Sequence, residues 1–254
     1  MVDIIIFTIK ENLFALNLEY TNRIIHIPEV TSVPSSHTAV DGMLSYEGEI
    51  LKVVNLRKLL EVQSYENELS ELFSALIIQH KTWLNELENA INGNTHFSGI
   101  VNPHLCELGK WLDKFNSYDD KVSKVLKTLI SNHTQLHNSA TDVMELLQKS
   151  QDDAKESFKK EIAPLYSRTM GSLDSLQNEF TYVANSLQKL LIYTNGVDKF
   201  TIKIDSIIDI IHIDESEITK EKSDVNSEHI EFSGVLKKDD KLINVISAIH
   251  LPKK

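Results

Sequence analysis

The pattern of apolar residues changes twice along the chain, and each change marks a change of secondary structure. Residues 1 to about 62 hold short β-branched runs separated by glycine, proline and serine, which is typical of short strands. From about 65 to 188 glycine is scarce and apolar residues recur every three or four positions, which predicts amphipathic helices. From about residue 190 the strand pattern returns. The order of the three segments predicts an α+β chain.

The two strand-rich flanks are too small to fold well separately. Strands are expected around residues 4–8, 13–17, 23–27, 43–46, 50–54, 190–193, 200–204, 207–213, 230–235 and 242–245. A flank of roughly 65 residues closes a core with difficulty, whereas the two together are an ordinary domain. We therefore expect one β domain split by an insertion, because insertions are tolerated where the two ends of a loop lie close together. The expected parts are residues 1–64, 65–188 and 189–254.

Four apolar stripes predict four helices in the middle segment. One stripe runs from Leu69 to Ile91 and ends in Asn-Gly-Asn, a common C-terminal signal. A short helix is expected over roughly 103–115, and a long one from Val122 to Leu147. The last stripe runs from Phe158 to Leu187, and Pro164 within it should kink or interrupt the helix. Four helices with short links predict an antiparallel bundle.

Charge and composition exclude several classes of protein. The net charge of −11 argues against non-specific nucleic-acid binding, which depends on basic side chains that neutralise phosphates. The single cysteine cannot form an intrachain disulfide, which fits a reducing compartment. The start of the chain lacks a signal-peptide pattern, and no apolar run is long enough to enter a membrane as a span. We expect a soluble cytoplasmic protein, with residues 214–228 as a solvated loop.

Three histidines and the cysteine of the middle segment form a possible metal site. His80, His133 and His137 lie in apolar stripes, and the four-residue spacing of the last two puts them on one helix face. Cys106 lies near the start of the short helix, where the helix dipole favours a thiolate. Imidazole and thiolate ligands favour zinc over calcium, magnesium or manganese. A buried histidine or cysteine is also an ordinary core residue, so the spacing alone leaves both interpretations open.

The other histidines lie in expected strands or loops and share no face. They are His26, His37, His96, His104, His212, His229 and His250. His104 is the best substitute ligand because it lies two residues before Cys106. Side chains two apart on a helix diverge, which ranks His104 below the His133–His137 pair.

The same residues carry a resemblance to a known family. His80, the string Cys106-Glu-Leu-Gly-Lys-Trp111 and the string His133-Thr-Gln-Leu-His137 resemble the pattern of the chemoreceptor zinc-binding (CZB) domain over roughly residues 66–150. The resemblance implies a Zn²⁺ site with His80, Cys106, His133 and His137 as ligands, and Gly109 and Trp111 as packing residues of the motif. It also implies that Cys106 is the redox-reactive residue. Such domains are associated with sensing of metal or hypochlorous acid, and are often dimeric.

The flanks resemble a second family. Residues 4–61 and 190–251 are similar to the two halves of the CheW-like coupling domain, which consists of two small SH3-like barrels of five strands each. That resemblance implies a non-enzymatic protein that links chemoreceptors to a histidine kinase. Ser45-Tyr46-Glu47-Gly48 replaces the Asn-Leu-Arg-Gly of the family and reverses a charge at Glu47. Such a reversal can reject a partner.

Together these features predict a bacterial signalling adaptor, not an enzyme, that senses zinc or an oxidant of the hypochlorous acid type. Loss of a ligand would release the short helix and change the packing of the bundle. A zinc enzyme is the first alternative, but catalytic zinc keeps an open position, and Glu86 and Glu107 are expected to face solvent. A di-iron bundle needs Glu-x-x-His pairs, which the sequence lacks. Zinc that only stabilises the bundle stays an open alternative, and so does a homodimer.

Overall fold

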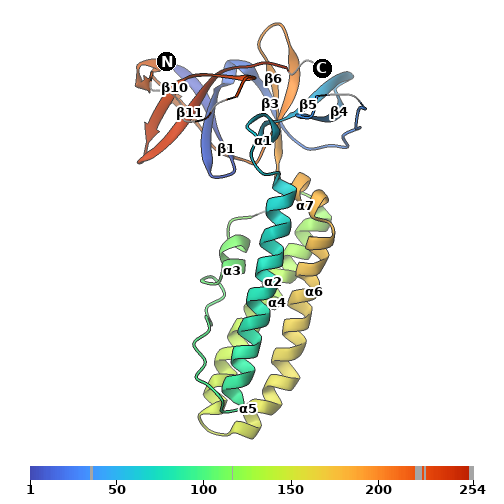
Figure 1. The fold of residues 1–254 in the computed structure, drawn as a ribbon, viewed down its shortest axis with the longest axis vertical. Helices are drawn as coiled ribbons and strands as arrows, with labels where there is room; N and C mark the ends of the chain where they lie inside the picture. Colours follow the sequence, from blue (N-terminus) through green and yellow to red (C-terminus); the bar gives the residue numbers. More distant parts are fainter. Residues whose placement is uncertain (35–36, 116, 221–224, 226, 252–254) are drawn as a thin grey trace. The chain divides into compact units, whose positions relative to one another are not determined.

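The protein consists of two compact units. The computed structural model describes residues 1–34, 37–115, 117–220, 225 and 227–251 (Figure 1). One unit contains residues 1–65 and 185–254, and the other contains residues 66–184. Ser35, Ser36 and part of the expected loop 214–228 lie outside the described residues. Within the described part of the chain, no helix is long and apolar enough to cross a membrane.

The first unit, here the β unit, is built from two sheets. Its elements are β1 (Val2–Ile9), β2 (Asn12–Asn17), β3 (Thr21–His26), β4 (Val40–Tyr46), β5 (Glu49–Asn55), α1 (Leu56–Leu59), β6 (Lys189–Thr194), β7 (Lys199–Ile204), β8 (Ser206–Ile213), β9 (Ile218–Thr219), β10 (Ile230–Lys238) and β11 (Lys241–Ile249). The strand orders are β8-β1-β2-β11-β10-β9 and β3-β6-β7-β5-β4. Each sheet therefore combines strands from before and after the helical segment.

Two parallel pairings join strands from before the helical segment to strands from after it. β11 runs parallel to β2, and β5 runs parallel to β7, whereas every other described strand pair is antiparallel. The α+β class and all the expected strands are confirmed, and Asn195-Gly196 does connect the hairpin β6–β7. β9 is an additional strand within the expected loop. The described strands pair into one six-stranded and one five-stranded sheet, and the closure of each sheet into an SH3-like barrel stays a prediction.

β1 is buried on both faces, which explains its unbroken apolar sequence. Ile5, Phe7 and Ile9 belong to the largest core cluster, together with residues of the second sheet. Ile4 and Ile6 point to the opposite face and belong to a smaller cluster within the first sheet. A strand with both faces buried gains no advantage from alternating polar residues.

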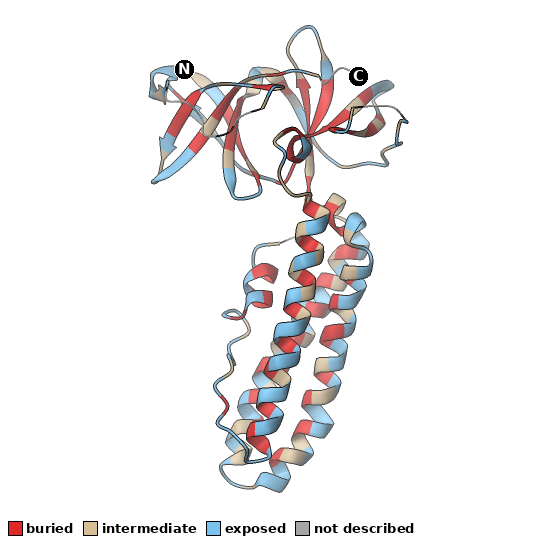
Figure 2. Cartoon of the chain, in the orientation of Figure 1, coloured by how far each residue is buried: buried red, intermediate tan, exposed pale blue. Residues whose placement is uncertain are grey.

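The second unit, here the bundle, contains three long helical columns. Its elements are α2 (Tyr65–Ile91), α3 (Glu107–Leu112), α4 (Asp120–Leu147), α5 (Gln151–Ser157), the π-helical turn Phe158–Ile162, α6 (Ala163–Asn178) and α7 (Phe180–Leu187). α2 begins at Tyr65, the last residue of the first segment of the β unit, and the last residues of α7 belong to the second segment of that unit. Buried residues follow one stripe of each long helix (Figure 2). The expected helices are confirmed, although α3 is shorter than the stripe over 103–115 suggested.

The last helical column is interrupted twice. The π-helical turn ends at Ile162, directly before Pro164 in the first turn of α6, and the chain stays helical through both. Pro164 has no N–H to bond to the preceding turn and its ring crowds the carbonyl there, so a wider turn at this place accommodates it. The predicted interruption at Pro164 is therefore confirmed. A second break at Glu179 separates α6 from α7 and has no proline or glycine to announce it.

The direction of the helices differs in one respect from the expected antiparallel bundle. Gln177 donates to Ser74 at 2.7 Å, and Gln151 donates to the Ile91 carbonyl at 2.8 Å, so the column after residue 150 runs opposite to α2. Tyr182 bonds to Asp119, which puts the start of α4 near the end of that column. α2 and α4 therefore run in the same direction (Figure 1). The reason is that residues 92–119 return along the bundle, and α3 is the only helix among the described residues of this segment.

Candidate metal centre

Four side chains from three elements of the bundle converge on one point. His80 comes from α2, Cys106 immediately precedes α3, and His133 and His137 come from α4. One ligand atom from each lies within 4.8 Å of all the others. The four residues are between 1% and 9% exposed. No other such group of histidine, cysteine or acidic side chains occurs in the described part of the chain.

The helix geometry explains the convergence. His133 and His137 are one turn apart on α4, with ring centroids 4.6 Å from each other. The His80 ring faces both of them across the bundle, with centroid distances of 5.4 and 6.0 Å. The Cys106 sulfur lies 3.2 Å from His133 Nε2. α4 therefore supplies two adjacent ligand positions, and the other two come from separate elements.

Cys106 is fixed by the start of α3. It is the N-cap residue, and its Sγ accepts a hydrogen bond from the Gly109 N–H at 3.3 Å. A Cβ at Gly109 would lie 1.7 Å from the Pro103 carbonyl oxygen, so only glycine permits this close turn. Trp111 packs edge-on against Phe73, with centroids 5.3 Å apart. These contacts show how both residues pack, while their role in the motif stays a prediction.

Burial keeps the four ligand groups neutral. It is the main cause that lowers the pKa of His80, of His133 to about 3 and of His137 to about 4. The neighbouring imidazoles contribute to the lowered pKa values of His133 and His137. Burial also raises the pKa of the Cys106 thiol, against the backbone N–H groups of Gly109 and Leu108, which lower it. The imidazoles are ready to bind a metal at neutral pH, whereas the thiol must release a proton.

The hydrogen bonds of two histidines engage their Nδ1 atoms and leave their Nε2 atoms available to bind a metal. His80 Nδ1 contacts the Leu76 carbonyl at 2.8 Å, and His137 Nδ1 contacts the Ile100 carbonyl at 3.0 Å. A carbonyl only accepts, so each Nδ1 is the donor and each Nε2 carries the lone pair. His137 Nε2 is buried and has no hydrogen-bond partner among the residues that the structure describes. Such an atom is costly without a ligand, and a zinc ion would satisfy it. The donor set therefore fits zinc.

The remaining histidines do not join the group. His104 Nδ1 contacts Asp113 at 3.0 Å and is exposed, so it is not placed as a substitute ligand. His212 and His250 lie in the β unit and contact Asp3 and Glu231. His229 contacts the exposed Glu228 at 3.2 Å.

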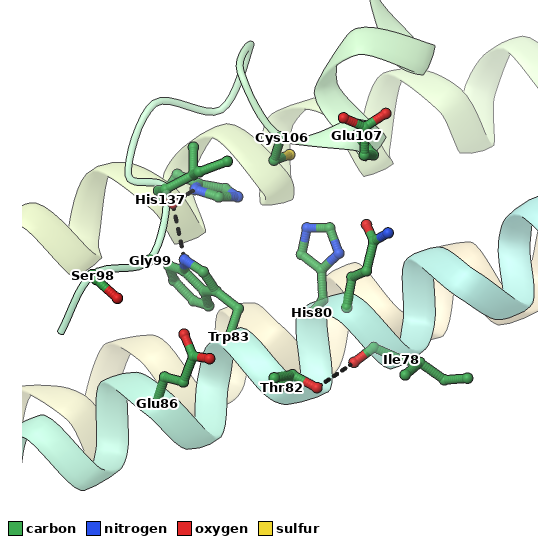
Figure 3. A pocket seen from close by; sticks show the side chains of 12 residues that line it. Ile78, His80, Thr82, Trp83, Glu86, Ser98, Gly99, Cys106, Glu107 and His137 are labelled. Carbon is green, nitrogen blue, oxygen red and sulfur yellow. Dashed lines mark hydrogen bonds between the residues drawn. The ribbon is translucent and has the colours of Figure 1, made fainter. Parts of the chain in front are cut away.

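A cavity of about 450 Å³ reaches the cluster from the side of α2. Figure 3 shows His80, Cys106 and His137 in its lining, together with Trp83, Glu86 and Glu107. The two glutamates are exposed, as expected from the sequence. Sequence reasoning did not assign Trp83 to the site, although its position three residues after His80 puts both on one helix face.

Comparisons with known proteins agree with this geometry. The CheW-like domain family matches residues 3–84, and the chemoreceptor zinc-binding domain family matches residues 80–144. The chemotaxis protein CheW of Thermotoga maritima is 29% identical over 73 residues, which are 29% of this chain and 48% of that protein. The match thus spans about half of that relative.

Two solved structures are similar at low identity. The scaffolding protein TtCheW from Thermoanaerobacter tengcongensis is 13% identical with a TM-score of 0.45, over 97% of this chain and 84% of that one. The regulatory CZB domain of DgcZ is 16% identical with a TM-score of 0.37, over 46% of this chain and 98% of that one. The two family models thus match adjoining parts of the chain, and the part that matches the chemoreceptor zinc-binding domain includes all four clustered residues.

Proposed function

We propose that this chain is a cytoplasmic, non-enzymatic adaptor of bacterial chemotaxis whose bundle senses a chemical condition through zinc. The β unit would couple chemoreceptors to a histidine kinase. The observation that carries the proposal is the buried cluster of three histidines and one cysteine, set in a helical segment between the two strand-rich parts of one CheW-like unit.

Strand pairing supports the proposed domain assignment. Residues 1–64 and 189–254 are proposed as the two halves of one CheW-like domain, with residues 65–188 as the inserted zinc-binding bundle. In support, β2 pairs with β11 and β5 pairs with β7, so each sheet needs both halves. Neither half could bury the largest core cluster alone, because that cluster draws on strands from both.

The proposed zinc ligands are His80 Nε2, Cys106 Sγ, His133 Nε2 and His137 Nε2. Four protein ligands complete a tetrahedral zinc site and leave no open position, which favours a sensing or structural ion over a catalytic one. The zinc enzyme and the purely structural ion stay as alternatives. An exchangeable water on the bound metal would support the enzyme, whereas unchanged partner binding without zinc would support the structural ion.

The cavity supports Cys106 as the reactive group, because it gives small molecules access to the residue. A thiolate that reacts with hypochlorous acid becomes a sulfenic acid and releases chloride, and the sulfur loses two electrons. A sulfenic acid is a poorer ligand than a thiolate. The chain has a single cysteine, so it holds no second thiol that could resolve the sulfenic acid as an intrachain disulfide.

A buried ion pair of the β unit would be displaced when the bundle repacks, because it bonds to residues just before and just after the bundle in the sequence. Arg57 donates to Asp205 at 2.6 Å, and it also donates to the Gln63 carbonyl at 2.8 Å. Asp205 accepts from Gln188 at 2.9 Å. Gln63 lies just before α2 and Gln188 just after α7. We propose that repacking of the bundle reaches the β unit through these two contacts.

The partner surface includes the reversed charge at Glu47. This residue forms an exposed ion pair with Arg23 at 3.4 Å, so the reversed charge is paired within the chain. The proposed receptor or kinase must tolerate an acidic group where the family carries arginine. A homodimer through the bundle is proposed as well, from the resemblance of the zinc-binding domain alone.

The test compares wild type with Cys106→Ala, each before and after mild treatment with hypochlorous acid. Zinc content and binding to a receptor signalling domain and its kinase are measured on the full chain. We expect one zinc per chain in the untreated wild type, and lower zinc content with altered partner binding after oxidation. Cys106→Ala should show no oxidant response. Absence of zinc from untreated wild type would refute the proposal, and equal partner binding before and after oxidation would refute sensing.

A further inference from the structure

We propose that Trp83 is a positioning residue of the zinc site, because it holds the Ile100 carbonyl that orients His137. The inference rests on the proposed function, since it assumes that His137 binds zinc. It adds a residue outside the four ligands and gives it a physical role.

One carbonyl oxygen accepts two hydrogen bonds at this place. Ile100 O accepts from Trp83 Nε1 at 2.9 Å and from His137 Nδ1 at 3.0 Å, and Figure 3 shows the bond of the Trp83 indole as a dashed line. The indole and imidazole rings also pack together, with centroids 4.9 Å apart. Trp83 is 8% exposed, so its ring is fixed by its surroundings. Trp83 therefore contacts His137 both directly and through the shared carbonyl.

His137 needs this support more than His80 does. The acceptor for His80 is the Leu76 carbonyl, which lies one turn earlier in the same helix and is fixed by α2. The acceptor for His137 lies in residues 96–102, which have no regular secondary structure. No helix or strand pairing holds the Ile100 carbonyl there, so its direction depends on local contacts such as the indole bond.

Gly99 allows the irregular segment to approach the indole. A Cβ at Gly99 would lie 2.8 Å from Trp83 Cδ1 and 2.5 Å from the Phe97 ring. Phe97 in turn packs edge-on against Trp83, with centroids 5.8 Å apart. Any side chain at position 99 would push the segment away from Trp83 and move the carbonyl at position 100.

The structure supplies a matched control for the indole N–H. Trp111 is the other tryptophan of the chain and is 6% exposed, close to the value for Trp83. Its Nε1 has no hydrogen-bond partner among the described residues. The substitutions Trp83→Phe and Trp111→Phe each replace a buried indole by a phenyl ring. Only the first removes a hydrogen bond.

The experiment measures zinc affinity of the full chain by competition with a chromophoric chelator. Loss of a hydrogen-bond partner of a histidine ligand costs about 10- to 100-fold in metal affinity. Trp83→Phe removes the support of that partner and not the partner itself, so zinc binding should weaken by about 10-fold, the lower end of this range. Trp111 packs in the same motif, so Trp111→Phe is the reference for a lost indole alone, and its loss of affinity should be smaller. With cobalt(II) in place of zinc, the visible absorption bands should shift more in Trp83→Phe than in Trp111→Phe, because only the first variant loses the bond that supports the acceptor of a ligand.

The outcomes separate this inference from the proposed function. If wild type binds no zinc, the proposed function fails and this inference fails with it. If wild type binds zinc and the two tryptophan variants have equal affinity and cobalt spectra, the positioning role alone is wrong. Should Trp83→Phe not fold, Gly99→Ala decides, because it keeps both tryptophans and displaces the segment. Wild-type zinc affinity in Gly99→Ala would then overturn the inference.

Discussion

The protein buries two polar clusters. The side chains of one cluster satisfy each other's charges and hydrogen bonds, whereas those of the other are arranged to bind a metal ion. In the β unit, Arg57 and Asp205 are 1% and 8% exposed and carry opposite charges. In the bundle, three imidazoles and a thiol are buried together without a countercharge among them. The first cluster is balanced by its own residues. The second is neutral, and among the described residues its His137 Nε2 has no partner, so a metal ion would complete it.

The ion pair of the β unit is satisfied by several hydrogen bonds. Arg57 Nε lies 2.8 Å from Asp205 Oδ1, and Arg57 Nη2 lies 2.6 Å from Oδ2, which is a two-pronged contact. Asp205 also accepts from the Lys10 N–H at 2.6 Å and from Gln188. The Arg57 guanidinium lies over the Tyr65 ring, 4.7 Å from its centroid. A buried ion pair is stable when its remaining donors and acceptors are satisfied in this way.

The difference teaches which cluster can respond to the environment. A pair that is complete within the chain changes only when the fold changes. A cluster whose His137 Nε2 lacks a described partner is completed from outside, so its stability depends on the supply of a metal. The same kind of burial thus produces a structural element in one unit and a chemically sensitive one in the other.

The largest expected effect is the removal of zinc. A structural zinc site contributes on the order of 10 kcal/mol of apparent binding free energy at neutral pH. Chelation should therefore lower the free energy of unfolding of the bundle much more than that of the β unit. Hydrogen exchange with and without a chelator measures both units in one sample. Equal loss of protection in α4 and in β6 would contradict the comparison.

A smaller effect is expected from Arg57→Met. It leaves the Asp205 carboxylate buried without its charge partner, which costs about 3–5 kcal/mol. Urea unfolding followed by circular dichroism measures the loss. The control is the double variant Arg57→Met with Asp205→Leu, which removes both charges and should recover most of the stability. The proposed path through Arg57 and Asp205 also predicts that partner binding by both variants depends less on zinc than it does in wild type, and an unchanged dependence would show that the change does not pass through this ion pair.

The smallest effect is expected at the exposed pair of Arg23 and Glu47. Both side chains are 61% exposed, and ion pairs of this kind contribute about 0–1 kcal/mol. A double-mutant cycle with alanine at each position measures the coupling free energy from thermal unfolding. A coupling as large as that of Arg57 and Asp205 would mean that burial is not what separates strong from weak pairs here.

Much of this organisation follows from local patterns in the sequence. The strands and helices appear as periodic apolar runs, and Pro164 marks its own interruption because it lacks an N–H. The four clustered residues were predicted because a spacing of four on a helix brings His133 and His137 together. His80 in its own apolar stripe and Cys106 at the start of a short helix completed the group, and the resemblance to the zinc-binding family then favoured a zinc site over ordinary core residues.

The rest depends on contacts between distant residues. The shared direction of α2 and α4 follows from the return path of residues 92–119, where the sequence predicts a short helix but not the path that the chain takes around it. Arg57 is a single charged residue in the sequence, and nothing local points to Asp205, 148 positions later. The Ile100 carbonyl is a backbone atom, so no residue type reveals that it orients His137. Such features are set by the tertiary path of the chain.

The parallel pairing of β5 with β7 has a consequence for the order of folding. Val54 lies opposite Ile202, so the second sheet is incomplete until the whole helical segment has been synthesised. The contact between Ser74 and Gln177 brings the start and end of that segment together once the bundle has folded. Prior folding of the bundle therefore shortens the loop that β5 and β7 must close, and lowers its entropic cost. A shortage of zinc during synthesis would then slow the assembly of a sheet that contains no metal ligand.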